Sequence, residues 1–124
     1  MALAAAKVMF ECVLSQGVNP ETGLLYASFK RSGTPIACES RTWMQTERFR
    51  AASVAYRRQY DQAGKALDMA SDGLFNHHFS GVPSGGWRDR IEADGQASMD
   101  RMPASTLYHV LGALIEADKV LDTD

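Results

Sequence analysis

The chain has 124 residues and a formal charge of -2 at pH 7, from 13 Lys and Arg against 15 Asp and Glu. Hydrophobic residues make up 45% and charged residues 23%, the composition of one ordinary soluble domain. This charge attracts neither a phosphate backbone nor an acidic membrane, so nucleic acid and membranes are not expected partners. The first apolar stretch is interrupted by Lys7 and Glu11, so it is too short and too charged for a membrane span or a secretory signal. This predicts a cytoplasmic protein.

Four helices are expected in chain order. The first takes up about the first fourteen residues and stops at Gly17, and a short hairpin follows between residues 24 and 36, flanked by turn signals. The other helices are predicted over Ser40–Gln59, with Ser40 as N-cap, Ala63–Phe79 and Ser105–Leu121. A glycine-rich loop and a short strand, Trp87–Ile91, separate the last two helices. Cys12 and Cys38 stand alone and are expected to be buried thiols.

An internal repeat has an offset of 62 residues. Glycines open and close two hairpins at this spacing: Gly23 and Gly33 in the first, Gly85 and Gly95 in the second. We expect two units, residues 1–62 and 63–124, each made of an outer helix, a hairpin and an inner helix. Helix pairs of this kind do not cover their own apolar faces and stack with neighbours, which points to an α/α barrel.

Three motifs make this suggestion specific. They are RTWMQTE at residues 41–47, GWRDRI at 86–91 followed by DG at 94–95, and MPASTLYH at 102–109. In this order and spacing they resemble the C-terminal part of the N-acylglucosamine 2-epimerase superfamily, which includes sugar 2-epimerases and aldose-ketose isomerases. The resemblance implies an all-α fold, with two helical-pair repeats of an (α/α)6 barrel and short β-hairpins between the helices. The whole barrel would hold about 370 residues.

The resemblance implies sugar isomerase or 2-epimerase chemistry on mannose, N-acylglucosamine or a phosphorylated sugar. Moving a proton beside a sugar aldehyde needs a base that titrates near neutral pH and donors that stabilise the enediolate oxygens. The family uses two acid/base histidines, of which one falls on His109 and the other lies upstream of this chain. Glu47, one repeat earlier, is expected to hold a substrate hydroxyl or orient an imidazole, and Arg41 to polarise the carbonyl oxygen.

Each assignment has a structural alternative. A histidine on an apolar helix can be a satisfied core residue, and the carboxylate of Glu47 can form an ion pair instead, with Arg41, Arg48 or Arg50. Trp43 and Trp87 are candidate substrate-binding residues, because aromatic faces suit the apolar faces of pyranoses, but Trp87 can equally pack in the core.

Neither a cofactor nor a metal is expected. The sequence has no phosphate loop or dinucleotide fingerprint, and proton transfer through an enediolate needs no cofactor. His77 and His78 are adjacent, point about 100° apart on a helix and have no third ligand at suitable spacing, so they predict an ordinary helix end.

The alternative function is a catalytically inactive helical-repeat fragment that binds carbohydrate or mediates oligomerisation. Two repeats leave the end helices without neighbours, and the last helix would present an apolar surface formed by Leu107, Val110, Leu111 and Leu114. A homo-oligomer is therefore expected, with a dimer favoured over a trimer. The helix that begins at Ser105 is also expected to be less exposed than Ala63–Phe79, because the outer layer faces water.

Overall fold

The computed structural model describes residues 1–98 and 101–122, and its architecture is all-α. The helices are α1 (Ala2–Gln16), α2 (Thr42–Arg57), α3 (Ala63–Gly73) and α4 (Thr106–Leu121), and a π-helical turn, η1 (Leu74–His78), continues α3. The short strands are β1 (Ser28–Phe29), β2 (Pro35–Ala37), β3 (Ser40–Arg41) and β4 (Arg90–Ile91). The predicted order of helices and the first hairpin are confirmed.

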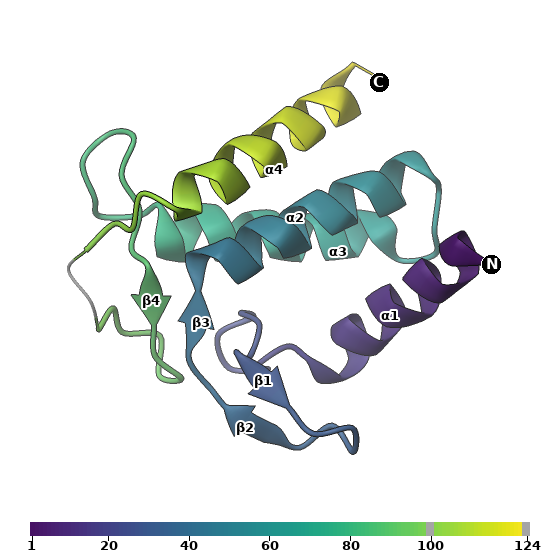
Figure 1. Ribbon diagram of the computed structural model, residues 1–124, viewed down its shortest axis with the longest axis horizontal. Coiled ribbons are helices and arrows are strands. Elements are labelled where there is room, and N and C mark those ends of the chain that lie inside the picture. Colours follow the sequence, from purple (N-terminus) through teal and green to yellow (C-terminus); the bar gives the residue numbers. More distant parts are fainter. Residues whose placement is uncertain (99–100, 123–124) are drawn as a thin grey trace.

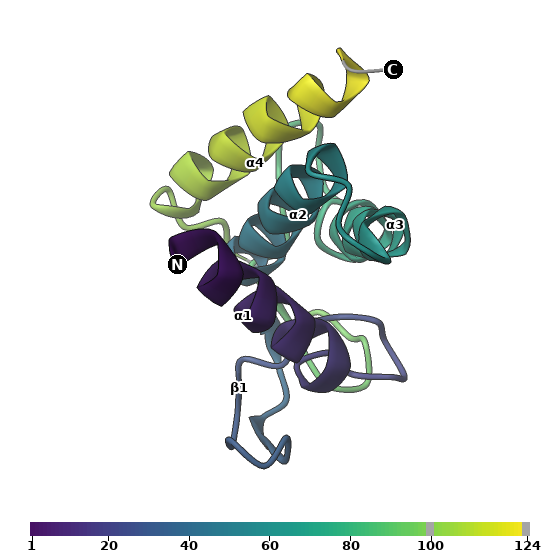
Figure 2. The same cartoon turned by 90° about the vertical axis from the view of Figure 1, so that its right-hand side faces the viewer.

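Helix α2 lies at the centre of the molecule. Figure 2 shows α4 on one side of it, α3 on another and α1 on a third. The strands and the longer loops gather at the ends of the helices opposite the two chain termini (Figure 1). This is the layering of two helical pairs of an (α/α)6 barrel, with α1 and α3 outside, α2 and α4 inside, and the ring open.

The hairpins follow the 62-residue offset in backbone detail. In the first unit β1 pairs antiparallel with β2 and Phe29 faces Pro35, and in the second unit Ile91 faces Ala97. The four glycines that delimit the predicted turns all have positive φ, between 73° and 87°. Side chains disfavour that backbone conformation, so glycine is favoured at each turn. The boundary between the two repeat units of this single domain, placed between residues 62 and 63, stays a prediction.

The core joins α2, α3 and α4 through small side chains. A continuous cluster of buried residues holds these helices together: Phe49, Ala52, Ala66, Ala70, Leu74 and Ala113. Alanine at the contact positions lets helix backbones approach closely and fill the interior without voids. Helix α1 reaches this cluster only with the partly buried Phe10 and Leu14, and none of its residues is fully buried.

Two local predictions from the sequence are wrong. Ser40 does not cap α2 but lies in β3, where its buried hydroxyl accepts a hydrogen bond from Gln45 Nε2 at 2.6 Å. The predicted strand Trp87–Ile91 shortens to Arg90–Ile91, which pairs antiparallel with β3. In both cases the pairing of β3 with β4, a contact between the two repeats, determines the local structure and overrides the preference of the local sequence.

The expected difference in exposure between α4 and α3 is also wrong. Leu107, Leu111 and Leu114 of α4 are 46%, 51% and 39% exposed, and of the four predicted apolar residues Val110 alone is buried. In α3, Ala63, Ala66, Ala70 and Gly73 are all buried. The reason is that α3 packs against α2, whereas one side of α4 is covered by no helix of the described chain.

The remaining expectations concern the two cysteines and the membrane. Both cysteines, Cys12 and Cys38, are exposed, which corrects the expectation of buried thiols. Across residues 1–98 and 101–122, no helix is both long and apolar enough to cross a membrane.

Candidate functional site

Glu47 and His109 form a hydrogen-bonded pair between the two inner helices. His109 Nδ1 donates to Glu47 Oε1 at 2.8 Å, between residues 62 positions apart. Both residues lie near the N-terminal ends of α2 and α4, so the repeat brings equivalent turns of the two helices side by side. The two side chains therefore project to the same side of the helical layer.

Aromatic rings flank the imidazole of His109. The ring of Trp43, one helical turn before Glu47, is tilted with its centroid 5.8 Å from that of His109. Tyr108 presents an edge-on ring 4.8 Å away. The side chains of His109 and Glu47 are 29% and 38% exposed, so the pair is open to solvent and to a small ligand.

The carboxylate fixes the chemistry of the imidazole. Because an ionised carboxylate only accepts, the proton of neutral His109 lies on Nδ1, and Nε2 carries the lone pair. The other carboxylate oxygen of Glu47, Oε2, lies 3.9 Å from Arg50 Nη1. The ion pair considered as an alternative for Glu47 thus exists with Arg50, in addition to the hydrogen bond with His109. A histidine held in this way is suited to exchange a proton through Nε2.

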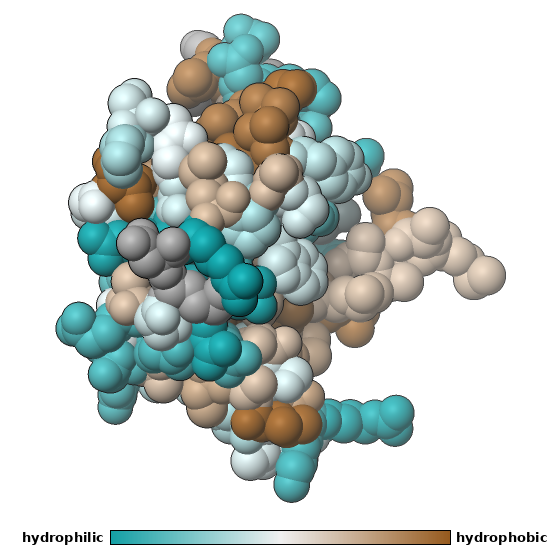
Figure 3. Space-filling view, turned by 60° about the vertical axis from the view of Figure 1, so that its left-hand side comes forward, coloured by the Kyte–Doolittle hydropathy of each residue, from teal (hydrophilic) through white to brown (hydrophobic). Residues whose placement is uncertain are grey.

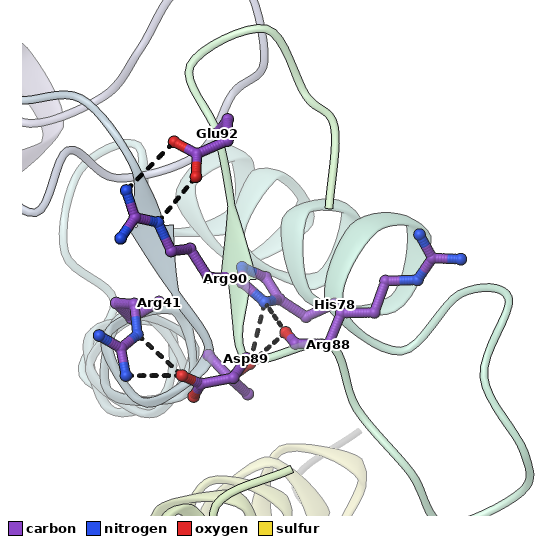
Figure 4. Close-up of polar contacts among 7 residues, drawn as sticks. Arg41, His78, Arg88, Asp89, Arg90 and Glu92 are labelled. Atoms are coloured by element: carbon purple, nitrogen blue, oxygen red, sulfur yellow. Dashed lines mark hydrogen bonds and ion pairs between the residues drawn. The ribbon is translucent and has the colours of Figure 1, made fainter. Parts of the chain in front are cut away.

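Arg41 is held by a buried carboxylate. Its Nε donates to Asp89 Oδ2 at 2.9 Å, and its Nη2 forms an ion pair with the same oxygen at 2.6 Å, as Figure 4 shows. The antiparallel pairing of β3 with β4 sets Arg41 opposite Arg90, which brings the adjacent Asp89 within reach. The Asp89 side chain is 1% exposed, and its charge is balanced by the partly exposed guanidinium of Arg41.

His78, which the sequence assigned to an ordinary helix end, is a buried polar residue. Its Nδ1 donates to the carbonyl oxygen of Arg88 at 2.7 Å and lies 2.9 Å from Thr42 Oγ1 (Figure 4). The Thr42 hydroxyl donates to the same carbonyl oxygen at 2.6 Å. Burial lowers the pKa of His78 to about 4, so the ring is neutral at physiological pH. The burial of one histidine could have been found from the helix geometry, because one of two adjacent histidines on an amphipathic helix faces the core.

A groove of about 490 Å³ runs between α1 and α2 and includes Trp43 and Glu47 in its wall. Its other lining is largely apolar, with Met9, Phe10, Val13, Leu14 and Met44 among its residues. Arg48 also lines it, nearly buried, and donates from Nη1 to the carbonyl oxygen of Gly23 at 2.6 Å. Burial lowers the pKa of Arg48 to about 10, which leaves its charge in place at neutral pH.

Trp87 lies apart from this groove. Its side chain is 6% exposed and lines a different hollow, of about 680 Å³, together with the loop over residues 81–86. The structure therefore brings together His109, Glu47 and Trp43 of the predicted site, whereas Arg41 contacts Asp89 and Trp87 packs in the interior. Among the described residues, no three His, Cys, Asp or Glu side chains are grouped closely enough to hold a metal ion.

Comparison with known proteins gives three similarities. Residues 1–113 match the family described as N-acylglucosamine 2-epimerase (GlcNAc 2-epimerase). A mannose-6-phosphate isomerase from Rhizobium meliloti (strain 1021) is 30% identical over an alignment 124 residues long. The alignment covers 97% of this chain and 32% of that protein. A crystal structure of D-mannose isomerase is similar with a TM-score of 0.80 and 26% identity, over 95% of this chain and 30% of that one. The chain thus spans about a third of the length of these relatives.

Proposed function

Because the chain belongs to the N-acylglucosamine 2-epimerase family, we propose that it carries one acid/base half of a sugar isomerase or 2-epimerase site. The substrate is an aldose, either mannose, an N-acylglucosamine or a phosphorylated sugar, and the reaction passes through an enediolate. The observation that carries this proposal is the 2.8 Å hydrogen bond between His109 Nδ1 and Glu47 Oε1, which leaves Nε2 as the reactive nitrogen.

The proposed reaction is a proton transfer at the carbon beside the carbonyl group. The lone pair on His109 Nε2 takes the proton from C2, and the electron pair of the broken C–H bond forms the enediolate. For isomerisation the imidazolium returns the proton to C1 while a second group moves the hydroxyl proton from O2 to O1, and for epimerisation a second acid protonates C2 on the opposite face. Glu47 acts through His109, because its negative charge stabilises the imidazolium that forms and keeps the ring in one tautomer.

The neighbouring side chains support substrate binding to different extents. The exposed Trp43 ring beside His109 offers a stacking surface for a pyranose. For Arg41 we keep the proposal that it polarises the carbonyl oxygen, and its hydrogen bond and ion pair with Asp89 would hold the guanidinium in position for that task. The burial of Trp87 favours its packing alternative over stacking against a sugar.

The proposal assigns no cofactor, because acid/base groups alone suffice for an enediolate reaction. It assigns the protein to the cytoplasm, on the sequence signals given above. It also assigns the second acid/base group to a part of the site beyond these 124 residues or to another copy, since the chain spans about a third of its relatives.

An enediolate analogue tests the acid/base role without requiring turnover. We expect an aldonohydroxamate, which resembles the planar enediolate, to bind about 10- to 100-fold more tightly than the corresponding aldose, the gain typical of one charge-assisted hydrogen bond. The dissociation constants are measured by ligand-observed NMR. His109→Asn should remove this preference, while His77→Asn, the same change on η1, should keep it.

Two results contradict the proposal. One is equal binding of the hydroxamate and the aldose to the unmodified chain. The other is a preference that survives in His109→Asn. Equal binding of both ligands at millimolar affinity would favour the alternative, a carbohydrate-binding module without acid/base function.

A further inference from the structure

Two helix faces of this chain are exposed although they carry apolar side chains. On α4 the face consists of Leu107, Leu111 and Leu114. On α1 it consists of Ala4, Val8 and Cys12, which follow one another at intervals of one helical turn. Figure 3 shows brown, apolar side chains gathered in the upper part of the molecule, where α4 runs. Contiguous apolar surface of this kind marks an interaction site in soluble proteins.

The 62-residue offset identifies what each face matches. The residues 62 positions before Leu107, Leu111 and Leu114 are Gln45, Phe49 and Ala52 on α2, and all three are buried. Helix α3 covers that side of α2 with Ala66, Ala70 and Leu74, which join Phe49 and Ala52 in one buried cluster. The residues 62 positions before this second set are Ala4, Val8 and Cys12. The exposed faces of α4 and α1 are therefore the two halves of a joint that the molecule already makes internally between α2 and α3.

We propose that copies of this chain associate head to tail, with α1 of one copy packed on α4 of the next copy as α3 packs on α2. The groove between α1 and α2 then receives α4, just as α2 lies between α3 and α4 (Figure 2). The occupant of the exposed α4 face is a second copy, because that copy supplies the matching surface. The inference does not depend on the sugar chemistry.

The two surfaces that meet are different, so the contact is heterologous and repeats from copy to copy until a ring closes. Three copies contain the six helix pairs of the barrel that the chain resembles. A trimer is expected on this ground, in place of the symmetric dimer that the sequence favoured.

At one point of this joint, the large and the small residue have changed sides between the contact within a copy and the contact between copies. Inside one copy, a Cβ on Gly73 would lie 3.0 Å from Leu24 Cδ2, so the α3 side of the joint leaves little room for a side chain at this position. At the equivalent positions between copies, 62 residues away in each direction, stand Glu11 and Gly86. The larger side chain is now on the helix and the glycine is opposite it. Gly86 lines the 680 Å³ hollow together with Arg88, which supplies a positive charge near the carboxylate of Glu11.

The joint also reaches the candidate site. Within one copy, the offset pairs Glu47 on α2 with His109 on α4. Between copies, the same geometry sets His109 of one copy beside Glu47 of the next. Each His109 then has a carboxylate on both sides, and the ring brings three histidines to one central surface.

Disulfide trapping tests the register of the contact. Cys12 is the equivalent of Leu74, and Leu111 is the equivalent of Phe49, which shares the buried cluster with Leu74. In a Cys38→Ser background, Leu111→Cys should give a covalent ladder on a non-reducing gel, with peptide mass spectrometry linking position 12 to position 111. Ile36→Cys, an exposed apolar position on the hairpin, is the matched control and should give none. Linkage of position 111 to itself would indicate a symmetric dimer and overturn the proposal.

Sedimentation equilibrium at micromolar concentration tests the assembly. The unmodified chain should reach the mass of three copies, and Leu111→Glu and Val8→Glu, one on each face, should each weaken association at least about tenfold. Ile36→Glu should leave it unchanged. Because all three positions are exposed in a single copy, circular dichroism should show native helix content in each variant. A monomer at all concentrations, or a species that stops at two copies, would overturn the proposal.

Discussion

Under conditions where the chain is monomeric, no solvent deuterium should enter C2 of mannose, glucose, N-acylmannosamine or their 6-phosphates. A single copy holds His109 and Glu47, whereas epimerisation or isomerisation needs a second group to complete the proton transfer. One general acid/base group contributes about 10²- to 10⁴-fold to such a rate. The open setting of the pair, with side chains 29% and 38% exposed, also admits water that a closed pocket would exclude.

Proton NMR in deuterium oxide measures this directly, as the loss of the C2 proton signal over hours to days. The comparison is between the unmodified chain, His109→Asn and a blank without protein. Wash-in by the unmodified chain that disappears in His109→Asn would contradict the expectation. It would mean that these 124 residues contain the full acid/base machinery, with Glu47 or water as the second group.

The features of the fold that could be predicted from sequence are those set by local backbone chemistry and by the repeat. Glycines at residues 23, 33, 85 and 95 mark turns because few other residues adopt positive φ, and each one does so here. The same spacing aligned Glu47 with His109, and the side chains meet at 2.8 Å. A repeat transfers the geometry of one unit to the next, so a pairing between units follows from sequence separation alone.

The features that could not be predicted depend on contacts between the two repeats. Ser40 has the local character of an N-cap, but β4 pairs with its backbone and draws it into a strand. Arg41 was expected to act on a substrate, and its contact with Asp89 arises from the same strand pairing. Helix α4 is exposed because it is the last helix of the described chain and has a neighbour on one side only. The pattern of apolar residues within the helix does not contain this information.

The buried imidazole of His78 shows how such a contact alters titration. Adjacent histidines at a helix end resemble surface residues in sequence. The π-helical turn η1 brings His78 beneath β4, where the Arg88 carbonyl oxygen accepts from its Nδ1 at 2.7 Å (Figure 4). Among the described residues, its Nε2 is buried without a hydrogen-bond partner. A proton added at Nε2 would therefore create a buried charge with no acceptor for the new N–H group.

Acidification is expected to destabilise the fold through this residue. Burial lowers the pKa of His78 from 6.5 to about 4, so between these values the unfolded chain binds a proton that the folded chain does not. The stabilising contribution is complete above pH 6.5 and is lost as the pH falls toward 4. A difference of this size corresponds to about 3 kcal/mol in the free energy of unfolding, of which about 2 kcal/mol is lost between pH 7 and pH 5.

Urea unfolding at pH 7 and pH 5 measures the effect. His78→Gln should lower the free energy of unfolding at pH 7, because it disturbs the contacts with Thr42 and Arg88, yet its further loss on acidification should be smaller than that of the unmodified chain by about 2 kcal/mol. His77→Gln, the neighbouring and partly exposed residue, should keep the original pH dependence. If His78→Gln and the unmodified chain lose equal stability between the two pH values, then His78 titrates with an ordinary pKa, and the neutral, buried imidazole is not what makes the fold sensitive to acid.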